Sequence, residues 1–137
     1  MPVVVQQDPE KLILDFIRTV IDGGHLPTPP SGSTWKLGRR PSANTTPSWF
    51  IQARMVGGEA EGLVAERPLV DVRVWADGGV STEADRSLAA RILLARIRQA
   101  FPCRVFAAPV PLPDPADPSK IHTLFTVQLL TRGVQQS

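Results

Sequence analysis

Apolar residues recur at helical spacing near the start of the chain, which predicts an amphipathic helix over residues 8–22. Asp8 is suited to cap its N-terminus, and Pro9 occupies the first helical position, where a missing N–H costs nothing. Gly23 and Gly24 follow the last apolar position and end the helix, since glycine readily adopts the left-handed conformation found there. The chain therefore opens with one well-delimited helix.

A second helix is predicted over residues 82–100, where Thr82 and Asp85 resemble a capping box. Two apolar rows run along it, and only Arg91 and Arg98 mark a polar stripe. A helix lying on one sheet needs fewer apolar positions. We favour burial between the sheet and the first helix; the alternative is contact with a neighbouring subunit.

Alternating apolar and polar positions predict four strands, over residues 49–56, 69–76, 103–108 and 121–131. The first two are expected to pair as an antiparallel hairpin joined by a polar connection over residues 57–67. In the second strand, the valines face one way and the other face carries Asp71, Arg73 and Trp75. A large aromatic on a polar face is a candidate interface anchor.

Proline marks two segments that we expect to lie outside regular structure. A long irregular stretch over residues 25–47 contains a proline-rich loop, residues 27–47. Alternate prolines over residues 109–118 predict a stiff, polyproline-like arm. The tail over residues 133–137 is expected to fray. The sequence thus predicts one α+β domain, residues 1–137, with an antiparallel or mixed four-stranded sheet, two helices on one face, and the other face left for loops or partners.

Composition narrows the class of protein. The chain has 137 residues, 20% of them charged, and a formal net charge of +2, too small for a dedicated nucleic-acid binder. Cys103 is the only cysteine, which favours a reducing compartment. Neither a signal peptide nor an apolar run of about 18 residues is present. We therefore expect no membrane association, and assembly in the cytoplasm or in a particle built there.

Catalytic and cofactor motifs find no support in the sequence. His25 and His122 lack zinc-ligand spacing, and there is no phosphate-binding loop, dinucleotide fingerprint or nucleophile elbow. Two weaker arrangements remain as alternatives: a carboxylate group made by Asp71, Asp77 and Asp85, and a nucleophile pair made by Cys103 and His122. We favour turn, helix-dipole and core roles for these residues. The expectation is a protein that is not an enzyme and needs no cofactor or metal.

The candidate contact residues lie in the predicted loop, the second strand and the proline arm. In the loop, Trp35 stands beside three basic residues, a pattern that binds nucleic acid or another protein; we favour a solvated loop or a protein contact. The full set of candidate subunit or partner contacts is Trp35, Lys36, Arg39, Arg40, Asp71, Arg73, Trp75, Pro109, Pro111, Pro113 and Pro115.

The order of these segments resembles the tail terminator family of long-tailed bacterial viruses, especially those that infect actinobacteria. The resemblance covers most of the chain and is one of pattern. It rests on the leading helix, on a strand ending in Met55-Val-Gly-Gly58, on Val70-Asp-Val-Arg-Val-Trp-Ala76, and on a helix with spaced alanines at 84, 89, 90 and 95. The segment over residues 71–76, leading into that helix, is the most characteristic part.

The resemblance implies a structural virion protein that forms a six-membered ring. Such a ring stacks on the last ring of tail-tube protein, stops tube growth and offers its other side to the head-completion or connector protein, while DNA passes through its centre. A ring of this kind needs head-to-tail interfaces, and an open strand edge would allow sheet pairing across subunits. The alternatives are another neck protein of the head–tail joint and, from a different class, a small enzyme or nucleic-acid-binding module.

Overall fold

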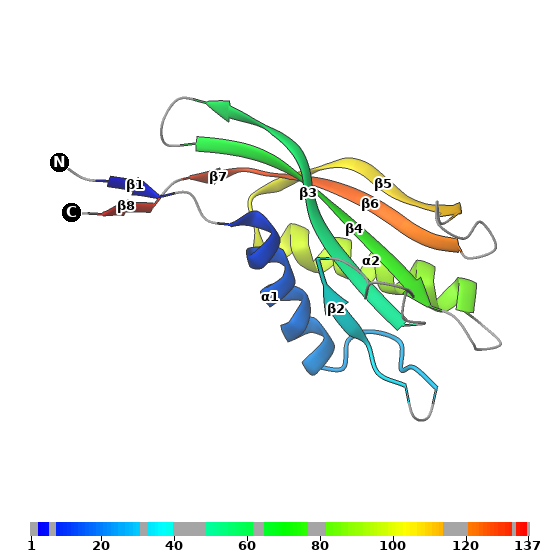
Figure 1. Ribbon diagram of the computed structural model, residues 1–137. Coiled ribbons are helices and arrows are strands. Elements are labelled where there is room, and N and C mark those ends of the chain that lie inside the picture. Colours follow the sequence, from blue (N-terminus) through cyan, green and yellow to red (C-terminus); the bar gives the residue numbers. More distant parts are fainter. Residues whose placement is uncertain are drawn as a thin grey trace.

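The computed structural model describes residues 3–5, 8–30, 33–39, 49–61, 65–76, 82–113, 121–132 and 134–136. Within these residues the chain forms an α+β fold, in which two helices lie on one face of a mixed sheet (Figure 1). The predicted class, a sheet with two helices, is confirmed. The number of strands differs from the prediction.

The main sheet has the strand order β2-β3-β4-β6-β5. Its strands, in that order, are Lys36–Gly38, Trp49–Glu61, Ala65–Ala76, Ile121–Leu129 and Cys103–Pro113. β2 runs parallel to β3, and every other neighbouring pair is antiparallel. A two-residue strand, β7 (Thr131–Arg132), pairs with the start of β4. The prediction of four strands is therefore wrong, because β2 lies inside the loop predicted over residues 27–47, where it is too short to leave an alternating pattern.

Both predicted helices are confirmed: α1 spans Pro9–Asp22 and α2 spans Thr82–Ala100. Oδ1 of Asp8 accepts hydrogen bonds from the backbone N–H groups of Glu10 (3.0 Å) and Lys11 (3.2 Å). These are donors that the helix itself cannot satisfy, so Asp8 caps α1 as its position in the sequence predicts.

The core lies between the two helices and the sheet face turned toward them. Its fully buried members come from both layers: Ile13, Ile17, Leu93 and Ile97 from the helices, and Ile51, Val70, Val72, Val74, Phe125, Val127 and Leu129 from the sheet. One apolar row of α2, which includes Ala89, is thus buried as we expected, whereas Leu88 is 42% exposed and Ala95 is also exposed. The outward stripe of α2 therefore carries apolar residues beside Arg91 and Arg98.

The β3–β4 hairpin is longer than its sequence pattern predicts. Register pairs continue from Trp49↔Ala76 to Glu61↔Ala65, with a β-bulge between Met55 and Gly57. The polar connection predicted over residues 57–67 is therefore wrong, since most of it pairs as two strands. Glycine and charge in this segment suppress a strand pattern, yet backbone pairing between adjacent antiparallel strands needs no buried face.

The proline segment also differs from its prediction. Pro109 to Pro113 belong to β5, where Val110 pairs with Leu124 and Leu112 with His122 of β6. The expected stiff arm is therefore wrong for residues 109–113, and residues 114–118 lie outside the described part of the chain. Alternate prolines are compatible with an edge strand, because the residues between them keep the N–H groups that pair inward.

The chain ends pair with each other instead of fraying. β1 (Val3–Val5) and β8 (Val134–Gln136) form a two-stranded antiparallel sheet and lie side by side in Figure 1. The expectation of a frayed tail is wrong for residues 134–136. A three-residue strand supported only by its partner leaves no periodicity that the sequence alone could reveal.

Candidate functional site

Polar and aromatic side chains gather on the sheet face turned away from α1 and α2, here called the second face. Cross-strand register places Phe50 beside Trp75, Gln52 beside Arg73 and Arg54 beside Asp71. On the other side of β4, Arg73 stands opposite Leu124 and Asp71 opposite Thr126. The predicted grouping of Asp71, Arg73 and Trp75 on one face of their strand is therefore confirmed, and it is joined by residues of β3 and β6.

Trp75 is buried within the second face. Its side chain is 6% exposed, and its ring lies 5.0 Å from the ring of His122 and 5.8 Å from that of Phe50, measured between centroids. Its Nε1 atom has no hydrogen-bond partner among the residues that the structure describes. Aromatic neighbours from β3 and β6 thus enclose Trp75, and its role as an interface anchor stays a prediction.

A short polar network adjoins this aromatic cluster. Nη1 of Arg73 donates to Nε2 of His122 at 3.0 Å, and Oγ1 of Thr126 donates to Oδ1 of Asp71 at 2.6 Å. Nη2 of Arg73 lies 3.8 Å from Oδ2 of Asp71. A guanidinium can only donate, so the bond to Arg73 assigns His122 the tautomer whose Nε2 accepts. These side chains hold one another and tie β4 to β6.

The described residues bring together neither of the two weaker catalytic alternatives. Cys103 pairs with Leu129 and His122 with Leu112, so the two residues stand near opposite ends of β6, roughly 23 Å apart at about 3.3 Å per residue. Asp71 lies on β4, Asp85 lies in the first turn of α2, and Asp77 lies outside the described residues. Burial raises the pKa of the Cys103 thiol, and the charge of Arg98 acts in the opposite direction.

The loop residues predicted as contacts have mostly internal roles. Trp35 is 7% exposed, donates from Nε1 to the carbonyl of Pro27 (2.9 Å) and packs edge-on against Trp49 at 5.0 Å. This candidate contact residue is therefore packed inside the chain, because the segment before β2 folds back over the core. Lys36 is exposed at the start of β2. Arg40 and Pro115 lie outside the described part of the chain.

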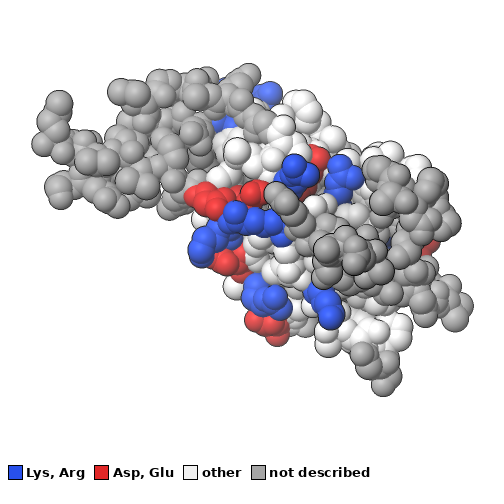
Figure 2. Space-filling model, in the orientation of Figure 1, with Lys and Arg blue, Asp and Glu red and all other residues white. Residues whose placement is uncertain are grey.

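Arg39 links the end of β2 to the start of α1. Its Nη2 atom lies 2.5 Å from Oδ2 of Asp8, and its Nη1 atom lies 3.7 Å from Oε1 of Glu10. Burial acts to raise the pKa of Asp8, but the N–H of Lys11 and the Arg39 guanidinium outweigh it, so the pKa of Asp8 lies below its ordinary value. In Figure 2, basic and acidic side chains interleave over this part of the surface.

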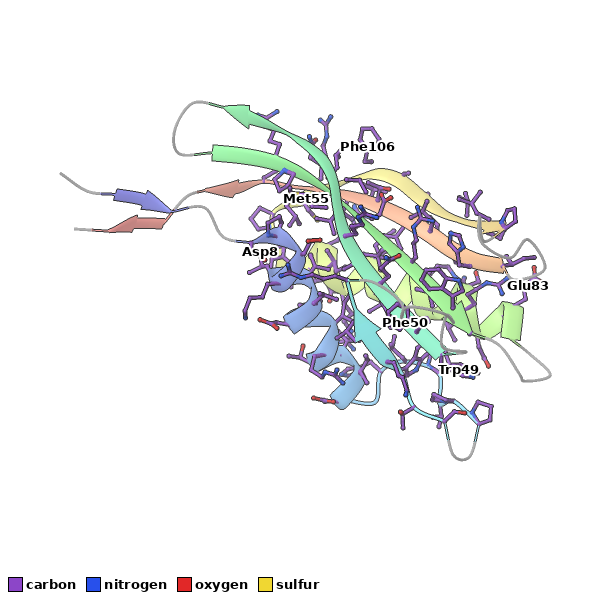
Figure 3. The ribbon with its side chains drawn as sticks, in the orientation of Figure 1. Asp8, Trp49, Phe50, Met55, Glu83 and Phe106 are labelled. Atoms are coloured by element: carbon purple, nitrogen blue, oxygen red, sulfur yellow. The ribbon has the colours of Figure 1, made fainter. Side chains whose placement is uncertain are left out.

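Exposed apolar side chains concentrate at the margins of the sheet. Eight large apolar side chains are exposed in the described part of the chain: Met55, Val56, Leu88, Phe106, Val110, Leu112, Ile121 and Leu130. Phe106, Val110, Leu112 and Ile121 follow β5 and the adjoining end of β6, and we call them the β5 margin. Met55 and Val56, together with Arg54, form the β3 margin. Figure 3 shows Met55 on β3 and Phe106 above β5.

Two β-bulges shape the β5 margin. Between Val105 and Val110, β5 uses two residues more than the segment of β6 that it faces, with register shifts on either side of Ala107. A bulge re-aims the neighbouring side chains. Phe106, at the first bulge, is 62% exposed. Sequence analysis did not identify this residue, and the only signal was a large aromatic inside a short strand next to a proline run.

The described residues contain no group of three or more His, Cys, Asp or Glu side chains arranged to hold a metal ion. Among the helices of the described chain, none combines the length and apolar character that crossing a membrane requires. Comparison with models of known protein families and with curated proteins finds no match to this chain.

Proposed function

We propose that this chain is a structural protein of a long-tailed bacterial virus, not an enzyme, and that it forms a ring which ends the tail tube at the head–tail joint. The observation that carries the proposal is the concentration of exposed apolar side chains along two sheet margins. An edge strand with exposed apolar groups aggregates unless it is paired or covered, so natural proteins retain such edges where a partner covers them.

The resemblance to tail terminators supports the same proposal. The most characteristic part of it lies in β4 and leads into α2, and these two elements pack against each other through the core. A closed ring uses a head-to-tail interface, in which two different surfaces of one chain meet on neighbouring copies. The β3 and β5 margins are two such surfaces. The proposed partners are further copies of the chain, six to a ring as the resemblance implies. The tail-tube protein would lie on one axial side of the ring, and a head-completion or connector protein on the other.

DNA is the remaining proposed neighbour, since it passes through the centre of such a ring. Residues 86–113 contain five arginines and no Asp or Glu. Arg91, Arg98 and Arg104 of this segment are exposed. A few dispersed positive charges attract phosphate without reading sequence, which suits transient contact with passing DNA.

Immunogold electron microscopy of intact particles tests the proposal. Antibody raised against the chain should label one position per particle, the junction between head and tail. Labelling along the tube or over the capsid would contradict a ring at the joint. Complete lack of label on particles, with the chain present in infected-cell lysate, would contradict a virion role.

A further inference from the structure

The two margins of the sheet differ in how much of each is already paired. β2 pairs with β3 only at Phe50, Ile51 and Gln52. Beyond Gln52, no strand in the described chain pairs with the outer side of β3, which continues to Glu61. At the opposite margin, β5 is the last strand of the sheet along its whole length (Figure 1). Among the described residues, the sheet therefore has one partly unpaired edge, on β3, and one edge without a neighbouring strand, on β5.

Prolines restrict which part of β5 can extend the sheet. Val110 and Leu112 pair inward with Leu124 and His122, so the intervening Pro111 and Pro113 direct their backbone nitrogens outward. Proline has no N–H to donate. The outer edge of β5 therefore offers only carbonyl acceptors at these positions, and its outward N–H groups lie in the half that begins at Cys103.

The open parts of the two edges lie at the same level of the sheet. Register joins Met55 to Val70, Val70 to Val127 and Val127 to Val105, so these residues form one row from margin to margin. The same tracing places Gln52, the last residue covered by β2, in one row with Arg73, Leu124 and Val110, where the prolines begin. At the end of the sheet that begins at this row, β2 covers one margin and the prolines restrict the other; we call it the closed end. At the opposite end, among the described residues, neither β2 nor Pro111 or Pro113 limits pairing at the margins.

Strand direction favours the same contact. β3, β4, β6 and β5 alternate in direction, so β3 and β5 run opposite to each other. A second copy in the same orientation would bring its β3 beside β5 as an antiparallel neighbour, which is the more stable pairing. Apolar groups stand at both surfaces: Met55 and Val56 are 48% and 50% exposed, and Phe106 is 62% exposed.

We propose that neighbouring copies of this chain join edge to edge, with the Cys103–Ala108 half of β5 on one copy beside the outer side of β3, from Arg54 onward, on the next. β2 and the prolines of β5 end this pairing at the closed end of the sheet. The inference rests on the proposed ring and names the surfaces that build it. A head-to-tail contact of this kind builds a closed ring when the rotation between neighbouring copies closes.

Substitutions at two exposed positions test the contact, and each one alters a single margin. Phe106→Asp places a charge on the β5 margin, and Val56→Asp places one on the β3 margin. Leu88→Asp, at a comparably exposed position on the outward stripe of α2, is the control. Association of the full-length chain is measured by sedimentation velocity over a concentration series, with circular dichroism to confirm folding.

The expected result is that wild type and Leu88→Asp assemble, whereas each margin variant alone associates at least about thirtyfold more weakly. Mixing the two margin variants should restore one intact interface and give a one-to-one pair that grows no further. Variants that assemble like wild type would overturn the edge contact. A mixture of the two margin variants that stays monomeric while wild type assembles would also overturn the edge contact. A wild-type chain that remains monomeric in solution yet labels the head–tail junction would overturn the edge contact and leave the proposed function standing.

Discussion

The indole ring of Trp75 lies 5.0 Å from the imidazole ring of His122, measured between centroids, on the sheet face opposite the helices. His122 is fully buried and receives a hydrogen bond from Arg73. The second face therefore has an interior of its own, built from an aromatic cluster that joins β3, β4 and β6. Trp75 packs inside this cluster, and the partner contact predicted for it is untested.

Trp75→Ala is expected to destabilise the fold by about 3–5 kcal/mol, since it removes a buried aromatic side chain and leaves a cavity. Urea unfolding followed by circular dichroism measures the change. Trp75→Phe is the matched variant, because it keeps an aromatic ring and removes an Nε1 donor that has no partner among the described residues. Trp75→Phe should lower the free energy of unfolding much less than Trp75→Ala does. A loss below about 1 kcal/mol for Trp75→Ala would show that Trp75 is not a core residue.

Asp8→Ala is expected to destabilise the protein by about 1 kcal/mol through loss of the α1 N-cap. Asp8→Asn should retain most of the stability, since asparagine caps comparably well. Thermal and urea unfolding at neutral pH measure the stability of both variants. Asp15→Ala is the control, because it removes only an exposed pair with Lys11. Equal losses at positions 8 and 15 would contradict the capping role.

The pKa of Asp8 predicts an acid dependence of stability. Its folded-state pKa is lower than its ordinary value of 3.8, so the ionised carboxylate stabilises the fold above that value. This contribution should fade as the pH falls through the folded-state pKa. In Asp8→Asn the group does not titrate, so the difference in unfolding free energy between the two proteins should shrink below pH of about 4. A difference that grows on acidification would contradict this sign.

Cys103 is expected to react more slowly with a thiol reagent in the folded protein than in denaturant at neutral pH. Burial raises the pKa of its thiol and so lowers the thiolate fraction. Arg98 acts in the opposite direction, so Arg98→Ala should slow the reaction further. Colourimetric thiol titration over time measures the rates. A folded-state rate above the denatured-state rate would indicate an activated cysteine instead.

Restoring N–H groups to the outer edge of β5 is expected to cause uncontrolled association. Pro111→Thr combined with Pro113→Thr leaves the inward pairs of Val110 and Leu112 intact and adds two outward donors. Light scattering should rise with concentration beyond that of wild type. Pro30→Thr, at an exposed position before β2, is the control. Unchanged scattering in the double variant would show that the prolines do not limit edge pairing.

The sequence predicted the parts of the fold that have strong local signals. Both helices match their predicted bounds, because Asp8 and the apolar repeats mark α1 and α2 directly. The face pattern of β4 was also predicted, since Val70, Val72 and Val74 alternate with polar residues. These features depend on neighbours a few residues away.

What the sequence did not predict depends on pairing between distant segments. The extension of β3 to Glu61, the incorporation of Pro109 to Pro113 into β5, and the strands at both chain ends all require a partner strand. Trp35 and Trp75 were proposed as contact residues because their local surroundings in the sequence are irregular or polar. Their burial follows from contacts with Pro27, Trp49 and His122, which lie elsewhere in the chain.

Electron microscopy of particles from cells infected with virus that lacks this chain tests most directly whether it ends the tail tube. We expect tail tubes of uncontrolled length beside filled heads without tails. Tubes of normal length beside heads that leak DNA would move the chain to the head side of the joint. Normal infectious particles would contradict a structural role altogether.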